Sequence, residues 1–453
     1  WRTLGNSLKQ GENLALLMHM HSGLGQIAEA ERASRAAIDV LEALPPSREL
    51  ALAYRTQASL RMFNRDSAEA IAWGEQAIAL AERFDDRETL AGAYNAIGSA
   101  QIVSDYARGR AALERSLAIA REAGLRLHVA NAYTNLGSAS GEVYQFLRAD
   151  HDLSEGIAFC VEHDLDMARL YMQAWQALTH LHLGRWSAVA DVADAVLQHP
   201  GVSTVSRLMA LVAIGRLRAR RGDPGVAEAL DEALELAAQT GHLQRLGPVH
   251  SARAEAAWLA GNHEQTLIEA RAVYDLAISK GHPWFTGELG FWHWRAEQHV
   301  ALPPWTARPF VLQMAGDWRA AATEWERLGC PYERAMALID GDHAAHLLAL
   351  KIFDQLGARP AAEMVRHKLR SITPRERERT TFDGLTERER QVAALIAQGN
   401  SNRAIAAAMS VGVKTIETYV TRILSKLGFD SRVQIATWAL EKRLATSPPR
   451  SSR

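Results

Sequence analysis

Ten polar side chains near the C-terminal end have the types and the spacing that contact with double-stranded DNA requires. They are Ser401, Asn402, Arg403, Lys414, Thr415, Glu417, Thr418, Thr421, Arg422 and Lys426. Lysine and arginine neutralise phosphates, whereas short hydroxyl and carboxylate side chains hydrogen-bond to base edges in the major groove. On a helix, Lys414, Thr418 and Thr421 project opposite an apolar stripe, so these residues predict a DNA-reading surface.

Two short helices are predicted to support this surface. Thr386 and Glu389 have the spacing of a capping box, so the first helix begins there, and Gly399 ends it. Ser401 or Asn402 caps the second helix. The apolar positions of these two helices are Val392, Leu395, Ile396, Ile405, Ala406 and Met409.

A third helix is predicted over residues 413–427 and a fourth over residues 431–444. The apolar side of the third helix consists of Ile416, Val420, Ile423 and Leu427. The second and third helices form a helix-turn-helix, which presents one exposed helix to a DNA groove. On the fourth helix, Ile435, Trp438 and Ala439 offer an apolar face for packing or for dimerisation.

These residues resemble the LuxR-type helix-turn-helix of the NarL/FixJ output domains. The matching positions are Leu385 to Glu389, Val392, Leu395, Gly399, Ser401 to Arg403, Ile405, Ala406, Lys414 to Ile416, Ile423, Lys426, Leu427 and Arg432. The resemblance covers roughly sixty residues. It implies DNA binding as a homodimer, with residues 413–427 as the recognition helix.

Three positions depart from the family pattern. Glu417 stands where the family often has a basic residue, Tyr419 where it has histidine, and Ala404 where a capping glutamate occurs. Glu417 could accept a hydrogen bond from a cytosine amino group. Alternatively, it pairs with Thr421 or Arg403 or faces solvent. The base preference of the family is therefore not carried over to this chain.

The long region before this module has a repeating pattern. A small residue followed by a large one recurs at Ala53-Tyr54, Ala93-Tyr94, Ala132-Tyr133 and Ala174-Trp175, at intervals of 39 to 42 residues. Because one helix pair cannot bury its own apolar face, this period predicts pairs stacked into an α-solenoid. The pattern resembles tetratricopeptide repeats, although its period exceeds their 34 residues. The overall fold class is therefore expected to be all-α.

We expect five segments along the chain. They are helical repeats over 1–280, an aromatic-rich helical cap over 281–371, a linker over 372–384, the DNA-binding domain over 385–445 and a disordered tail over 446–453. In the cap, Trp284, Trp292 and Trp294 either pack a solenoid end or line a ligand pocket, and packing is favoured.

Charge and composition agree with this division. The last 69 residues hold eleven Lys/Arg against five Asp/Glu, a net +6, so the whole-chain charge of −1 leaves −7 for residues 1–384. A basic module on an acidic body predicts a polyanion partner at the C-terminal end alone. Cys160 and Cys330 form no CxxC motif, and no long apolar run occurs. We therefore expect a bacterial cytoplasmic protein that associates with the nucleoid when bound to DNA, without a membrane segment, metal or cofactor.

The helical region also resembles large LuxR-family regulators in which a repeat lies between an ATPase and the DNA reader. Segments 329–335 and 356–362 carry this resemblance. No GxxxxGK[ST] motif occurs, so an ATPase, if it belongs to this protein, would precede Trp1.

The sequence thus favours a transcriptional regulator whose repeat region binds a protein or small-molecule effector and controls the C-terminal module. The alternative is a repeat scaffold for protein interactions that does not bind DNA. An enzyme is disfavoured, because the one suggestive cluster, Asp342 with His343 and His346, lacks a third ligand signal.

Overall fold

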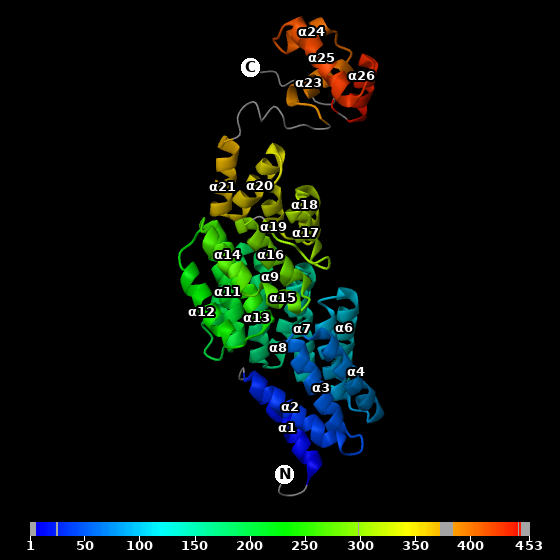
Figure 1. Cartoon of the computed structure of the whole chain (residues 1–453), viewed down its shortest axis with the longest axis vertical. Coiled ribbons are helices and arrows are strands. Elements are labelled where there is room, and N and C mark those ends of the chain that lie inside the picture. The colour runs from blue at the N-terminus through cyan, green and yellow to red at the C-terminus, as the bar shows by residue number, and fades with distance from the viewer. Residues whose placement is uncertain (1–5, 24–25, 298, 372–383, 443, 445–453) are drawn as a thin grey trace. The chain divides into compact units, whose positions relative to one another are not determined.

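The computed structural model describes residues 6–23, 26–297, 299–371, 384–442 and 444. Within these ranges the regular structure is helical and contains no β-strand, which confirms the all-α fold class (Figure 1). The chain forms two compact units, residues 1–340 with 349–362, and residues 341–348 with 363–453. The predicted tail and all but the last residue of the predicted linker lie outside the described residues. No helix in the described part of the chain is long and apolar enough to cross a membrane.

The first half of the repeat region consists of helices of similar length joined by short turns. They are α1 (Ser7–Gly23), α2 (Ile27–Glu42), α3 (Arg48–Phe63), α4 (Ser67–Arg83), α5 (Arg87–Gln101), α6 (Tyr106–Glu122), α7 (Arg126–Glu142), α8 (Phe146–Glu162), α9 (Asp166–His182) and α10 (Trp186–Leu197). Short connections make consecutive helices antiparallel neighbours.

Later helices are less regular in length. They are α11 (Thr204–Arg221), α12 (Val226–Ala238), α13 (Leu243–Leu259), α14 (His263–Ala272), α15 (Tyr274–Ser279), α16 (Pro283–Glu297), α17 (Arg308–Met314), α18 (Trp318–Arg327), α19 (Pro331–Leu338), α20 (His343–Leu356) and α21 (Arg359–Ser371).

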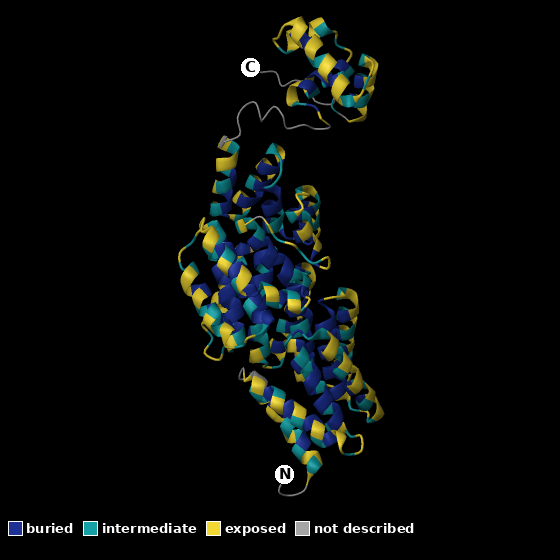
Figure 2. Ribbon diagram, in the orientation of Figure 1, coloured by how far each residue is buried: buried dark blue, intermediate teal, exposed yellow. Residues whose placement is uncertain are grey.

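Odd-numbered helices from α1 to α13 form a continuous inner layer. Each of them contacts the next odd-numbered helix as well as its neighbours in sequence. Helices α5, α7 and α11 are consequently buried along most of their length, and Figure 2 shows buried residues concentrated in the interior of the repeat region. The small residues of the sequence pattern, Ala53, Ala93, Ala132 and Ala174, lie in α3, α5, α7 and α9 and have no exposed surface. The solenoid expected from the period is therefore present.

Close helix approach depends on glycine at a few positions. A Cβ atom on Gly98 of α5 would lie 2.7 Å from the carbonyl oxygen of Gly109 in α6. Gly137 of α7 lies equally tightly against the side chain of Leu153 in α8. A methyl group at Gly98 would push the backbones of α5 and α6 apart. These two helices therefore pack at this distance only because Gly98 and Gly109 are both glycine.

A buried ionic network joins helices that are distant in sequence. Arg220 of α11 pairs with Glu255 of α13 (2.7 Å) and with Glu333 of α19 (2.9 Å). His182 of α9 lies 2.8 Å from the same Glu333 carboxylate. Burial alone would raise the pKa of Glu333, but Arg220 and His182 lower it to about 2. Glu333 therefore stays ionised beside Arg220, and the contacts of this network hold α9, α11, α13 and α19 together.

The C-terminal module contains the four predicted helices, α23 (Glu387–Ala397), α24 (Asn402–Ala408), α25 (Val413–Leu427) and α26 (Arg432–Glu441). They enclose one apolar core, which consists of Leu385, Val392, Ala393, Ile396, Ile405, Ala406, Ile416, Ile423, Ile435 and Ala439. The fourth helix is shorter than predicted. Its end is closed by a bond from the Leu444 N–H to the Ala439 carbonyl five residues earlier, as in a Schellman motif.

Candidate nucleic-acid interface

Capping interactions set the positions of the helices in this module. Thr386 and Glu389 form the predicted capping box, with the Thr386 N–H donating to Glu389 Oε2 (2.8 Å) and the Glu389 N–H to Thr386 Oγ1 (3.3 Å). Ser401 rather than Asn402 caps α24, because its Oγ accepts from the Ala404 N–H (3.3 Å). Gly399, with φ +82°, ends α23 in the left-handed conformation.

Helix α25 has one buried side and one exposed side, as predicted. Ile416 and Ile423 have no exposed surface, and Val420 and Leu427 are half-buried against the same core. On the opposite side every polar side chain is exposed, namely Lys414, Thr415, Glu417, Thr418, Thr421, Arg422 and Ser425. A helix with this division can lie against another surface without disturbing its own core.

Three of the predicted phosphate-binding cations are exposed and available. Arg403 of α24 and Lys414 and Arg422 of α25 have no carboxylate oxygen within 4.0 Å anywhere in the described ranges. No side chain caps the start of α25 at Gly412. The first-turn N–H groups of this helix and Lys414 together form a positive end that suits an anion.

Two of the ten residues predicted to contact DNA also form bonds inside the domain. The Lys426 ammonium lies 2.6 Å from Glu389 Oε2, so it neutralises the buried carboxylate of the capping box. Asn402 is half-buried, and its Oδ1 accepts from Arg432 Nη1 (2.6 Å). Both residues connect helices of the module, and their contact with DNA stays a prediction.

The hydroxyl groups of α25 are partly satisfied by their own helix. Thr418 Oγ1 donates to the Lys414 carbonyl and Thr421 Oγ1 to the Glu417 carbonyl, both at 3.0 Å. Their oxygens can still accept hydrogen bonds from a ligand. Among the described residues, the Glu417 carboxylate has no ion pair with Arg403 or any other cation. Its place on the exposed side leaves its predicted role as a base reader open to test.

The predicted dimerisation face on α26 is wrong for two of its three residues. Ile435 and Ala439 have no exposed surface because they complete the domain core, and Trp438 is half-buried beside them. The sequence interpretation missed Val433 and Leu440, which are 72% and 56% exposed. They lie seven residues apart, which puts them on the same side of the helix. This spacing was a signal that the interpretation did not use.

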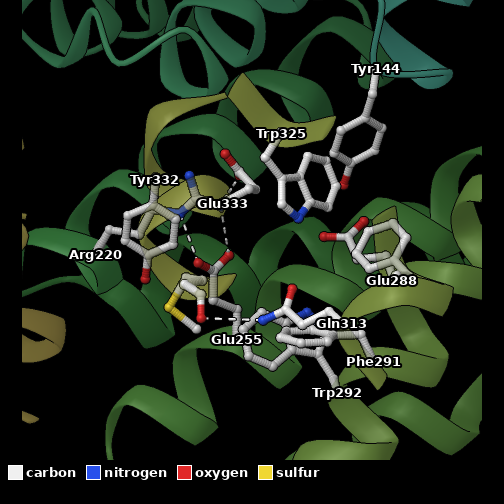
Figure 3. A pocket seen from close by; sticks show the side chains of 12 residues that line it. Tyr144, Arg220, Glu255, Glu288, Phe291, Trp292, Gln313, Trp325, Tyr332 and Glu333 are labelled. Atoms are coloured by element: carbon white, nitrogen blue, oxygen red, sulfur yellow. Dashed lines mark hydrogen bonds and ion pairs between the residues drawn. The ribbon is translucent and has the colours of Figure 1, made fainter. Parts of the chain in front are cut away.

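The aromatic cap contains a packed core and only a small cavity. Trp284 stacks on Tyr144 with ring centroids 4.6 Å apart. A cavity of about 30 Å³ lies between the aromatic and ionic side chains, as Figure 3 shows for Trp292, Glu255 and Tyr332. That volume holds a water molecule or two but no organic ligand. The packing interpretation of the tryptophans is therefore the one that the structure supports.

The suggestive His/Asp cluster has a local structural use. Asp342 Oδ1 accepts from the Ala345 N–H (3.0 Å) at the start of α20. In the ranges that the structure describes, no group of three or more His, Cys, Asp or Glu side chains could hold a metal ion. Cys160 and Cys330 are both buried as free thiols.

Comparisons with known proteins agree with the geometry of the C-terminal module. Residues 383–439 match the family model described as bacterial regulatory proteins, luxR family. The chain is 35% identical over 88 residues to the DNA-binding transcriptional activator DevR/DosR of Mycobacterium tuberculosis, which covers 19% of this chain and 39% of that protein. It is 43% identical over 63 residues to the response regulator protein VraR of Staphylococcus aureus, covering 14% and 30% respectively.

The matched region thus spans well under half the length of these relatives. A solved structure of Rap protein complexed with competence and sporulation factor aligns with 58% of this chain and 74% of that one, at 14% identity and a TM-score of 0.47. The family match and the observed helices coincide at the C-terminal end. Residues 383–439 are therefore a helix-turn-helix domain of the LuxR family.

Proposed function

We propose that this protein is a sequence-specific DNA-binding transcriptional regulator, with α25 as the helix that enters the major groove. The observation that carries the proposal is the outer side of α25 and α24. There Arg403, Lys414 and Arg422 are exposed without a carboxylate partner in the described part of the chain. Three unpaired cations around a helix of short polar side chains are complementary to a phosphate backbone and a groove.

The two LuxR-type relatives support the proposal by their own names, a transcriptional activator and a response regulator. Because the matched region covers a minor part of each relative, regulation by the rest of this chain is a separate proposal. We propose that the helical repeats bind an effector and control access of the LuxR-type domain to DNA. A homodimer on DNA, joined through the exposed side of α26, is part of the same proposal.

Salt-dependent DNA binding tests the central claim. Fluorescence anisotropy of the full chain with a labelled random duplex, at about 50 to about 300 mM salt, should give an affinity that falls linearly on logarithmic axes. Three phosphate contacts for each domain predict a slope of about −3 per domain. Absence of binding at the lowest salt would favour the alternative, a repeat scaffold that does not bind DNA.

Sequence specificity needs a second measurement. Selection from a random duplex pool should enrich one motif, and the protein should bind that motif at least about a thousandfold more tightly than unselected DNA. If the pool stays random while salt-dependent binding persists, the protein binds DNA without reading it. In that case the regulatory part of the proposal fails.

A further inference from the structure

A hollow of about 390 Å³, lined by both polar and apolar side chains, lies among the inner helices of the repeat region. Its walls include side chains from six odd-numbered helices, α3 to α13. The volume falls within the range of small-molecule binding sites. It is also roughly ten times the volume of the cavity in the aromatic cap, so the hollow can hold an organic ligand and not only water.

Three arginines line the hollow, and no carboxylate of the described residues does. Arg55, Arg65, Arg245 and His128 contribute to its wall, and no Asp or Glu does. Arg65 is already neutralised, because its Nε lies 2.8 Å from Glu142 Oε1 behind the wall. Arg245 and Arg55 line the hollow as well, and Glu88 and Asp86 lie near enough to Arg55 to favour its charged form.

Arg245 is a buried cation of this wall without a counter-charge among the described residues. It is only 8% exposed, and its guanidinium contacts the Tyr171 hydroxyl at 3.3 and 3.4 Å. Across the described residues, no carboxylate oxygen lies within 4.0 Å of it. A guanidinium stays charged when buried, and a buried charge without a counter-charge destabilises the fold. A bound anion would remove that penalty.

Other polar atoms of the wall also have no partner. Asn95 Oδ1 and Thr134 Oγ1 are buried and form no hydrogen bond within the described structure. Asn131 and Asn135 add amide groups from α7, which can both donate and accept. Buried polar atoms are rarely left unsatisfied, so this wall fits a ligand that supplies hydroxyl or amide groups.

The pKa values of two histidines in this region are lowered by nearby positive charges as well as by burial. Burial lowers the pKa of His242, and the nearby Arg245, Arg65 and Lys280 lower it further, to about 4. Burial and then Arg55 lower the pKa of His128, which lines the hollow. Both imidazoles are therefore neutral at pH 7 and leave the arginines as the charged groups.

We propose that this hollow is the effector site of the repeat region and that it binds a small organic anion. A carboxylate or phosphate of the ligand pairs with Arg245, and its hydroxyl or amide groups bond to Asn95 and Thr134. The link from this site to transcription rests on the proposed function, whereas anion binding itself does not depend on it.

Calorimetric titration of the full chain tests the site, with citrate, glucose 6-phosphate and glucose as probes. At least one of the two anions should bind, and uncharged glucose should bind at least about tenfold more weakly. Binding by citrate alone identifies a carboxylate ligand, and binding by the sugar phosphate alone identifies a phosphate ligand. If neither anion binds, or glucose binds equally well, the proposal is overturned.

Three variants locate the binding. Arg245→Gln removes the charge and keeps a polar side chain, and Asn95→Asp adds a negative charge at constant size. Each should weaken anion binding about tenfold or more. Arg207→Gln is the matched control, because Arg207 pairs with Glu232 on an exposed surface outside the hollow. Unchanged anion binding in Arg245→Gln and Asn95→Asp would place the anion elsewhere and contradict the proposal.

Stability without ligand gives a readout that needs no probe. If Arg245 is held for a ligand, Arg245→Met should keep or raise the Tm of the unliganded chain, because it removes a buried unpaired charge. A clear fall in Tm would show that Arg245 serves the fold, which overturns its assignment. DNA binding of the wild-type chain is measured separately without anion. If the wild-type chain does not bind DNA, the proposed function is contradicted, whereas the proposal that the hollow binds an anion is not.

Discussion

Lys414 and Arg422 are the residues on which phosphate binding by α25 should depend most. Both are exposed and have no carboxylate partner among the described residues. We expect Lys414→Ala and Arg422→Ala to weaken binding to all duplexes and to reduce the steepness of the salt dependence by about one each. The measurement is anisotropy titration at several salt concentrations. Arg388→Ala, an exposed arginine of α23, is the control and should change the slope less.

Glu417 and Thr418 should affect sequence preference rather than overall affinity. Their side chains are exposed on the side of α25 opposite its core, where a base edge can be reached. We expect Glu417→Ala and Thr418→Ala to change the motif selected from a random pool, each costing about 1–3 kcal/mol of discrimination at one position. Thr437→Ala on α26 is the matched control, because its hydroxyl donates to the Val433 carbonyl in the same way. An unchanged motif in both variants would exclude these residues as readers.

Lys426 tests whether the family pattern or the tertiary contact defines a residue's role. Because its ammonium lies 2.6 Å from Glu389, we expect Lys426→Ala to destabilise the LuxR-type domain by about 0.5–1 kcal/mol. The salt dependence of DNA binding should hardly change. Urea unfolding and the anisotropy series measure the two quantities. If Lys426→Ala lowers the steepness of the salt dependence by about one and leaves the free energy of unfolding unchanged, Lys426 contacts DNA.

At the scale of the element, α26 has a core side and an exposed side with different consequences. We expect Val433→Asp and Leu440→Asp to leave the domain folded and to change the DNA complex from two chains to one, because an aspartate disfavours an apolar contact between copies. Sedimentation of the complex measures the stoichiometry, and circular dichroism checks the fold. Ile435→Asp is the contrasting control and should unfold the domain, since Ile435 is fully buried. Two chains on DNA in both surface variants would refute dimerisation through this side.

At the scale of the whole molecule, the solenoid depends on a second buried ion cluster centred on Glu142. This carboxylate accepts from Arg65 Nε (2.8 Å), Gln244 Nε2 (3.1 Å) and His282 Nε2 (2.9 Å), which are up to 140 residues away in sequence. We expect Glu142→Ala to destabilise the repeat region by about 3–5 kcal/mol, because it leaves the Arg65 charge buried without a partner. Guanidinium unfolding measures this. The double variant Glu142→Leu with Arg65→Met should recover much of the loss.

The same clusters predict the response of the chain to acid. Arg220 holds the pKa of Glu333 at about 2, below its usual value, despite burial. Burial lowers the pKa of His182 and His282, so these imidazoles are neutral in the folded chain. Unfolding therefore takes up protons at all three residues, and stability should fall as the pH drops below about 6.5 and again below about 4.5. A Tm that is constant between pH 7 and pH 4 would contradict this.

Most of the architecture could be predicted from local sequence. The capping box at Thr386, the left-handed Gly399 and the apolar spacing of α25 involve residues within four positions of one another. Such signals depend on one helical turn, so a sequence displays them directly. The period of 39 to 42 residues likewise predicted the inner layer of the solenoid, because each repeat places its small residue at the same contact between helices.

Which polar side chains are available was decided only by the tertiary structure. Lys414 and Lys426 are both lysines of α25, but Glu389, 37 residues away in the chain, lies beside Lys426, whereas no described carboxylate oxygen lies within 4.0 Å of Lys414. In the same way, the packing of α26 buries Ile435 in the domain core and leaves Val433 exposed. The sequence by itself determined the helices, their caps and the LuxR-type domain, because those depend on near neighbours. The free cations and the hollow around Arg245 depend on which distant charges the fold brings together, and pairing of that kind exists only in three dimensions.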